Sequence, residues 1–219
     1  MSSRRYLPAL RFPALTRFFD PFIRVAMPER RFKRQLVEQA APEPGQRILD
    51  VGCGTGTLAI LVGSTQPEAE VIGLDADPEI LEQACGKAEA GPARVRFDQG
   101  LSTDLPYEDE SFEVVLSTLF FHHLTGVDKR TTAAEIARVL RPAGELHVAD
   151  WGRPGDPLMR VLFNGVRAFD GFERTRDNVA GALPRIFEGA GLERATETDR
   201  LRTAFGTLAL YRARKPELG

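Results

Sequence analysis

Apolar and polar positions alternate with two different periods through the middle of the chain. Short apolar runs predict β-strands at residues 47–51, 70–75, 94–97, 112–117 and 145–150. Longer segments between them predict α-helices at 57–66, 78–89 and 128–140. Strands that alternate with helices form a parallel sheet through right-handed crossovers, with helices on both faces. The pattern therefore predicts an α/β, Rossmann-like fold.

The last part of the chain is less regular. Residues 151–175 carry no clear pattern, and residues 179–189 predict a helix. Two further strands are predicted at 192–200 and 205–212, with a polar segment between them that suits a hairpin. We therefore expect a mostly parallel sheet with an antiparallel edge strand.

The first part of the chain predicts a helical cap. Pro8, Pro13, Pro21 and Pro28 divide it into short helical pieces, in which apolar residues recur at spacings of three and four. A turn-forming segment, residues 42–45, then marks a boundary. We expect a cap or lid over residues 1–41 and a Rossmann-like domain over residues 42–219.

Composition is ordinary for a soluble domain, with 42% hydrophobic and 27% charged residues among 219. No apolar run approaches the roughly 18–20 residues of a membrane-spanning helix. Cys53 and Cys85 are too far apart for a metal-ligand spacing, and two cysteines make no disulfide framework. We expect a cytoplasmic protein with no nucleic-acid partner, and the oligomeric state stays open.

Charge is distributed unevenly. Residues 1–34 hold nine basic and two acidic side chains, whereas the remainder holds 20 basic and 29 acidic ones. This asymmetry predicts contact of the basic segment with an anionic partner or an anionic membrane surface. The alternative is a solvated helix face that pairs with the acidic body.

A glycine-rich loop, Asp50–Gly56, follows the first predicted strand directly and opens a helix. Its glycines let the backbone turn tightly and approach a ligand, and the helix N-terminus offers free N–H groups. Nineteen residues beyond Gly56, Asp75 ends the second strand, where a carboxylate can accept hydrogen bonds from ribose hydroxyls. The alternative is a structural turn with a solvated aspartate, but the strand–loop–helix context favours a nucleoside ligand.

The chemistry of the loop selects between nucleoside ligands. The dinucleotide fingerprint needs Gly or Ala where this chain has Thr57. Asp50 stands two residues before Gly52, where a carboxylate suits a ligand with an ammonium group and repels a pyrophosphate. An adenosyl sulfonium amino acid therefore fits better than NAD.

Four ordered blocks carry a family resemblance: RILDVGCGTGTLA (47–59), VIGLDADPEIL (71–81), LPYEDESFEVVLS (105–117) and RVLRPAGELHVAD (138–150). Over about residues 45–150 the chain resembles class I S-adenosylmethionine-dependent methyltransferases, in particular the ubiquinone/menaquinone methyltransferase-like group. The resemblance implies methyl transfer to a small, partly apolar acceptor that is quinone-, lipid- or natural-product-like, with S-adenosyl-L-homocysteine as the cofactor product.

The resemblance also implies which residues hold the cofactor: Asp50, Gly52, Cys53, Gly54, Gly56, Asp75, Ala76, Leu101, Ser102, Ser117 and Leu119. One position departs from the family pattern. Leu101 stands where the family often has an acid that accepts from the adenine amino group, so Ser102 or a backbone carbonyl would have to replace that contact.

Two histidines, His122 and His123, follow the fourth predicted strand, on the side where the acceptor is expected. An imidazole there can act as a general base, and we expect His123 to be the catalytic one. His122 and Trp151 are expected to contact the acceptor, while the alternative is that these side chains only cap and pack. No metal site is expected, because Asp156, Asp170 and Glu173 form no evident ligand set.

Two rival functions remain at this stage. An NAD-dependent oxidoreductase is disfavoured by Thr57 and Asp50. A non-catalytic protein of the same fold, which binds the cofactor or another nucleoside, is left open by Leu101. The identity of the methyl acceptor cannot be taken from the pattern of residues.

Overall fold

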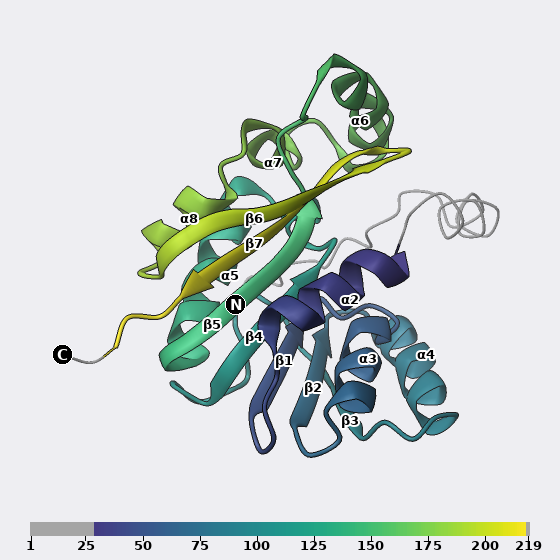
Figure 1. Ribbon diagram of the computed structural model, residues 1–219, viewed down its shortest axis with the longest axis vertical. Helices are drawn as coiled ribbons and strands as arrows, with labels where there is room; N and C mark the ends of the chain where they lie inside the picture. The colour runs from purple at the N-terminus through teal and green to yellow at the C-terminus, as the bar shows by residue number, and fades with distance from the viewer. Residues whose placement is uncertain (1–28, 218–219) are drawn as a thin grey trace, which may run out of the picture.

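The computed structural model describes residues 29–217. Its strands form one seven-stranded sheet in the order β3-β2-β1-β4-β5-β7-β6 (Figure 1). The strands are β1 (Arg47–Val51), β2 (Glu70–Asp75), β3 (Val95–Gln99), β4 (Phe112–Thr118), β5 (Leu140–Trp151), β6 (Glu193–Thr203) and β7 (Gly206–Arg214). The first five strands pair in parallel, and β7 pairs antiparallel with both β5 and β6. The mostly parallel sheet with an antiparallel edge is thus confirmed.

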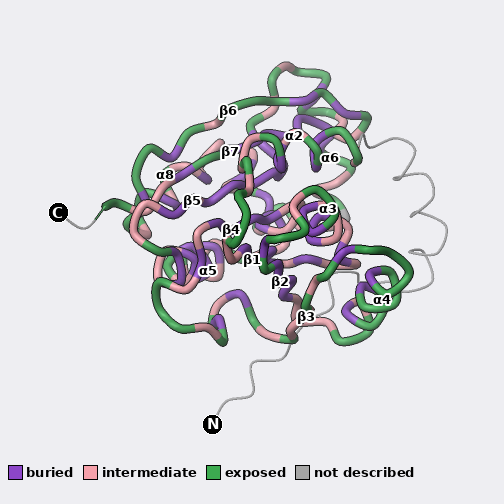
Figure 2. The backbone as a smooth tube through the Cα atoms, turned by 60° about the horizontal axis from the view of Figure 1, so that its bottom comes forward, coloured by how far each residue is buried: buried purple, intermediate pink, exposed green. Residues whose placement is uncertain are grey.

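Helices cover both faces of the sheet. They are α2 (Glu29–Ala40), α3 (Thr57–Thr65), α4 (Pro78–Glu89), the 3₁₀ turn η1 (Phe121–His123), α5 (Gly126–Val139), α6 (Pro157–Asp170), α7 (Arg176–Ala180) and α8 (Leu183–Gly189). Side chains of α2, α3 and α6 pack into one core cluster, and those of α5 and α8 pack into the other. Figure 2 shows the result: burial is concentrated along the inner strands, while the edge strand β6 is largely exposed.

Side-chain caps fix where two of the predicted helices begin. Asp77, the predicted N-cap of α4, accepts hydrogen bonds from the backbone N–H groups of Glu79 (2.9 Å) and Ile80 (3.4 Å). Thr125 accepts from the N–H of Asp128 at 3.2 Å and caps α5. This cap makes α5 begin two residues before its predicted start, and the prediction was late because it did not recognise Thr125 as a cap.

Helix α6 lies in the segment for which the sequence predicted nothing. Among the α6 residues whose burial is described, Met159 and Phe163, four positions apart, are buried at 3% and 1% exposure, whereas Leu158 and Val161 are 56% and 66% exposed. The apolar side chains of α6 nevertheless recur with the helical period along one side of the helix. The sequence therefore carried a helical signal here, and the helix should have been predicted from it.

Two other predictions differ by more than the shifts of one to three residues found at the ends of β3, β6 and β7. Gly181, with φ of 67°, ends α7 in the left-handed region, so the single helix predicted over 179–189 is wrong and α8 is separate. Strand β5 begins at Leu140, before its predicted start, and its pairing with β4 is irregular there.

Helix α2 belongs to the same core as the sheet. Phe32 and Leu36 have no exposed surface and pack with residues of β1 and α3. The rest of the predicted cap, residues 1–28, lies outside the described residues. No helix within residues 29–217 is both long and apolar enough to cross a membrane.

Candidate functional site

The carboxyl ends of β1, β2, β4 and β5 meet at one edge of the sheet (Figure 1). In parallel sheets, ligands bind at this edge because the loops and helix N-termini gather there. The glycine-rich loop, Asp75 and the segment of the two histidines all follow these strand ends. The structure therefore brings the predicted cofactor residues and the predicted acceptor residues to one edge.

The glycine-rich loop has the backbone that its glycines permit. Gly52, Gly54 and Gly56 all lie in the left-handed region, with φ of 71°, 54° and 69°. A Cβ on Gly52 would lie 2.2 Å from the ring of Phe120, and one on Gly56 would lie 2.6 Å from the ring of Phe97. A Cβ on Gly54 would meet nothing within 4 Å. The loop is thus packed at its two ends and open in the middle.

Asp50 is the most unusual carboxylate of the site. It is 1% exposed, and neither of its carboxylate oxygens has a partner at hydrogen-bond geometry, although the backbone N–H of Ala59 lies near enough to lower its pKa. Burial raises its pKa to about 7, although the nearby charge of Lys33 from α2 opposes the shift. A buried carboxylate without a partner is costly, so this position suits a cationic ligand group.

Asp75 connects β2 to the glycine-rich loop. One carboxylate oxygen accepts from the N–H of Gly54 at 2.9 Å, and the other accepts from the N–H of Asp77 at 3.1 Å. Each carboxylate oxygen can accept a further hydrogen bond, so the group can still receive ribose hydroxyls. Ala76 lies beside it, and its carbonyl accepts from the side chain of Gln99 at 3.3 Å.

Cys53 fills space inside the loop. Its side chain is buried against Gly73, and burial raises the pKa of its thiol. A thiol that stays protonated is a poor nucleophile, so Cys53 is a packing residue here.

The two residues predicted at the adenine differ in what they offer. Leu101 is 44% exposed and presents an apolar surface. Ser102 is buried, and its hydroxyl shares a 2.8 Å hydrogen bond with that of Thr132. The Ser102 hydroxyl is therefore already engaged in the interior, and its replacement of the missing acid stays a prediction.

The end of β4 turns sharply out of the sheet. The buried hydroxyl of Ser117 donates to the carbonyl of Val51 at 2.8 Å, which ties β4 to the start of the glycine-rich loop. Leu119 follows with φ of 52°, an uncommon conformation for a residue other than glycine. Its N–H donates to the carbonyl of Ala149 at 2.8 Å. The following loop is thus held between the ends of β1 and β5.

Asp150, at the end of β5, organises the loop that carries the histidines. It has no exposed surface, and its carboxylate accepts from the N–H groups of Phe120 (3.0 Å) and Trp151 (2.6 Å). It also pairs with Nδ1 of His122 at 2.8 Å and accepts from the side chain of Asn178 at 3.2 Å. One buried carboxylate therefore fixes both the course of the loop and the orientation of the His122 ring.

His122 and His123 occupy different environments. The side chain of His122 is 5% exposed; burial lowers its pKa, but the carboxylate of Asp150 outweighs this and raises it. The side chain of His123 is 30% exposed, and its pKa is lowered well below the usual value by burial and by the charges of His122 and Arg174. The two ring centroids are 3.9 Å apart, so the rings stack at a tilt.

Trp151 packs inside the molecule. It is 5% exposed, with its ring 5.2 Å from that of Phe163 and 6.3 Å from that of His122. The indole therefore supports the loop from below, and its predicted contact with the acceptor stays a prediction.

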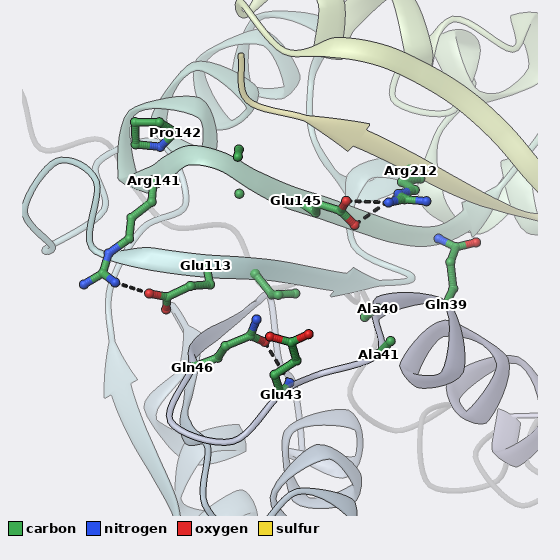
Figure 3. Close-up of a pocket in the computed structure, with 13 residues that line it drawn as sticks. Gln39, Ala40, Ala41, Glu43, Gln46, Glu113, Arg141, Pro142, Glu145 and Arg212 are labelled. Carbon is green, nitrogen blue, oxygen red and sulfur yellow. Dashed lines mark hydrogen bonds and ion pairs between the residues drawn. The ribbon is translucent and has the colours of Figure 1, made fainter. Parts of the chain in front are cut away.

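A pocket of about 450 Å³ opens at the opposite, amino-terminal edge of the parallel strands (Figure 3). Its lining is charged, and its arginines are paired: Arg141 with Glu113, and Arg212 with Glu145. This pocket holds none of the residues that the sequence predicted for the cofactor or the acceptor.

The sequence placed Asp150 at the end of a strand without giving it a role, assigned nothing to Asn178, and led Asp170 to be rejected as a metal ligand. Asp150 ends the last strand predicted before the unpatterned segment, which was its only signal. Asp170 and Asn178 lie in α6 and α7, which the sequence did not define, so nothing in the pattern placed them near the histidines.

Comparison with known proteins agrees with this geometry. Residues 48–144 match the model of a family described as a methyltransferase domain. This part of the chain is a methyltransferase domain. A demethylmenaquinone methyltransferase of Deinococcus radiodurans is 33% identical over 135 residues, which cover 62% of this chain and 55% of that protein. The aligned region thus spans little more than half of that relative.

Solved structures share the fold. The YcgJ protein of Bacillus subtilis superimposes with a TM-score of 0.67 at 21% identity, over 85% of this chain and 98% of that one. The cyclase SpnF also has a TM-score of 0.67 at 21% identity, over 86% and 82% of the two chains. The class I methyltransferase fold expected from the four sequence blocks is confirmed.

Proposed function

We propose that this protein transfers a methyl group from S-adenosylmethionine to a small, partly apolar acceptor of quinone, lipid or natural-product type. Two features of the glycine-rich loop carry the proposal. Asp50 is a buried carboxylate without a hydrogen-bond partner, and the backbone at Gly54 is open to a ligand. The methyltransferase-domain match and the quinone methyltransferase relative support the same activity.

The residues present fit the cofactor. Asp50 would neutralise its ammonium group, and the carboxylate of Asp75 would accept from its ribose hydroxyls. The open backbone at Gly54 leaves room for the methionine part, and exposed Leu101 would cover the adenine with apolar surface. Gly52 and Gly56 hold the shape of the loop. When bound, the cofactor supplies an electrophilic methyl group with a built-in leaving group.

The chain's own contribution to the reaction is mainly positioning. Ser117 and Leu119 shape the floor of the site between the loop and β5. His123 stands on the acceptor side with 30% of its side chain exposed, and we assign it the role of proton acceptor toward an acceptor hydroxyl. His122, fixed by Asp150, would border the acceptor beneath it.

The two rival functions fare differently. A buried carboxylate at Asp50 opposes the pyrophosphate of NAD, which disfavours the oxidoreductase. A non-catalytic protein of this fold would also use Asp50 and Asp75, so only turnover separates it from an enzyme. Transfer of an isotope-labelled methyl group to quinol-like acceptors is the decisive measurement. Tight S-adenosylhomocysteine binding without turnover on any acceptor would favour the non-catalytic alternative.

Asp75→Ala tests the cofactor assignment. Loss of a charge-assisted ribose contact should weaken S-adenosylhomocysteine binding by about 1.5–3 kcal/mol, or roughly 10- to 150-fold, in calorimetric titration. Because Asp75 also holds the N–H of Gly54, Asp75→Asn serves as the matched variant that retains one acceptor oxygen. Unchanged affinity in a folded Asp75→Ala protein would refute the ribose contact.

The basic segment adds a second partner to the proposal. Residues 1–34 are strongly basic, and Arg30, Arg31 and Arg34 are exposed on α2. We propose that this segment covers the site and touches anionic membrane, where an apolar acceptor would reside. Co-sedimentation with anionic vesicles at low and high salt tests this contact. The cytoplasmic location expected from the sequence stays a prediction, which cell fractionation would check.

A further inference from the structure

Three side chains converge beside the histidine loop although they come from distant segments. Nε2 of His122 lies 3.7 Å from one carboxylate oxygen of Asp170, and Nδ1 of His123 lies 3.6 Å from the other. One ligand atom from each of the three residues lies within 4.8 Å of the other two. These separations exceed direct hydrogen-bond distances, so the three groups face a common centre without bonding each other across it.

We propose that His122, His123 and Asp170 form a binding site for a divalent transition-metal ion, with Zn²⁺ as the test ion. Two imidazole nitrogens and one carboxylate oxygen are a donor set that such ions take, with further positions left open. Bonds of about 2.0–2.1 Å in tetrahedral geometry separate ligand atoms by roughly 3.4 Å. The observed 3.6 and 3.7 Å are close to this value, but they run to different oxygens of Asp170. Because the ligand atoms lie within 4.8 Å of one another, side-chain rotations would have to bring them around one centre.

The surroundings of the cluster match those of a metal site. A metal-binding histidine usually donates its other ring N–H to a carboxylate, and Nδ1 of His122 lies 2.8 Å from the buried carboxylate of Asp150. This bond leaves Nε2 of His122 directed at Asp170. A histidine that only packs does not need a fixed tautomer. A histidine that binds a metal needs both its tautomer and its ring orientation to be fixed.

Charge balance also allows a dication. Asp150 and Asp170 contribute two carboxylates at the cluster, and the side chains of these residues are 0% and 12% exposed. Lys129 donates to the carbonyl of Arg174 and lies 3.6 Å from the carboxylate of Asp177. Its charge also acts on His122 and Asp150, so it competes with a dication. Arg174 is a competing positive charge near His123, which would weaken binding without removing a ligand.

A bound ion would also have a role in the proposed methyl transfer, and this role rests on the proposed function. The cluster lies on the acceptor side of the site, so an open coordination position would take an oxygen of the acceptor. His123 would then act as a ligand and not as a proton acceptor. The ion would favour acceptors with a phenolic or enolic oxygen, because such an oxygen binds a metal ion in its deprotonated, anionic form.

The experiment uses the full chain without a histidine tag. Zn²⁺ is titrated in competition with a chromophoric chelator, and Co²⁺ is added separately to record the visible absorption of a low-symmetry site. His123→Ala and Asp170→Asn remove one ligand each at partly exposed positions, which protects the fold. Glu173→Gln is the matched control, because Glu173 is an exposed acid three residues beyond Asp170. S-adenosylhomocysteine affinity is measured for every variant.

We expect one Zn²⁺ per chain with micromolar or tighter affinity, weakened at least tenfold in His123→Ala and Asp170→Asn and unchanged in Glu173→Gln. Absence of stoichiometric binding, or binding that both ligand variants retain, would overturn the proposal. Metal binding without S-adenosylhomocysteine binding would instead refute the proposed function and leave the metal site standing. The methyl-transfer rate of the wild type should fall on chelation if His123 is a ligand, and should be unaffected if it is only a base.

Discussion

At the scale of single residues, the glycine-rich loop separates positions needed for packing from a position available to a ligand. Gly52 and Gly56 cannot carry a side chain because Phe120 and Phe97 lie against them. Gly54 has the same left-handed backbone but open space above it. The sequence motif treats the three glycines alike, and only their neighbours distinguish them.

Asp50→Asn should make the unliganded protein more stable at neutral pH while it weakens cofactor binding. The pKa of Asp50 rises from 3.8 to about 7 on folding, so its contribution to stability falls as pH rises through that window. An asparagine carries no charge, although its amide is also buried. We expect a gain of about 1–2 kcal/mol at pH 8, measured by urea unfolding, that shrinks toward about pH 4.

Asp104→Asn is the control for this effect, because Asp104 is exposed and should change stability by less than about 0.5 kcal/mol. A less stable Asp50→Asn protein at pH 8 would mean that the buried carboxylate is compensated in the folded state. Residues at a ligand site are commonly unfavourable for stability, which is the pattern expected here.

At the scale of elements, helix α2 precedes the four sequence blocks that carry the family resemblance, yet it is part of the hydrophobic core. Its buried side chains, Phe32, Leu36 and Val37, lie on one face and pack against β1 and α3. The same face carries Lys33, whose charge acts on Asp50. The helix therefore contributes both stability and electrostatics to the site.

Phe32→Ala should cost about 3–5 kcal/mol, because a fully buried ring is removed and a cavity remains. Arg31→Ala on the same helix is the matched control, since Arg31 is exposed and should change stability by less than about 0.5 kcal/mol. Urea unfolding followed by circular dichroism measures both. Equal, small effects would mean that α2 does not pack as described.

At the scale of the whole molecule, one charged network joins α2, β5 and β7. Glu145 pairs with Nε2 of His147 at 3.0 Å and accepts from Nε of Arg212 at 3.0 Å, while Gln39 of α2 lies 2.9 Å from Nδ1 of His147. The hydrogen bond with His147 and the contact with Arg212 lower the pKa of Glu145 to about 2, against the opposing effect of burial.

Glu145→Gln should therefore destabilise the protein at neutral pH and lose its effect in acid. A depressed carboxyl pKa contributes stability above about 4.5, and that contribution disappears as pH falls toward about 2. Because Glu145 is partly exposed, we expect only about 1–2 kcal/mol at pH 7. Thermal unfolding from pH 2 to 7 tests this, with exposed Glu82→Gln as the control. A difference that persisted unchanged at pH 2 would contradict it.

The sequence by itself determined the central fold and placed together the residues that we propose to hold the cofactor. Short strands, helix periods and the Asp50–Gly56 loop are local patterns, and the chain order of strand, loop and helix fixes where they meet. The bounds of β2 and α4 were predicted to the residue, because a β-branched run and an Asp77–Pro78 cap define them locally.

Only the tertiary structure decided how the residues that we propose for the acceptor side are arranged. Asp150, Asp170 and the histidines lie in three segments separated along the chain, and their proximity depends on where α6 returns over the sheet. Likewise, the burial of Trp151 and the engaged hydroxyl of Ser102 follow from neighbours that no local pattern names. Contacts between distant segments carry no periodic signal, so they emerge only when the chain is folded.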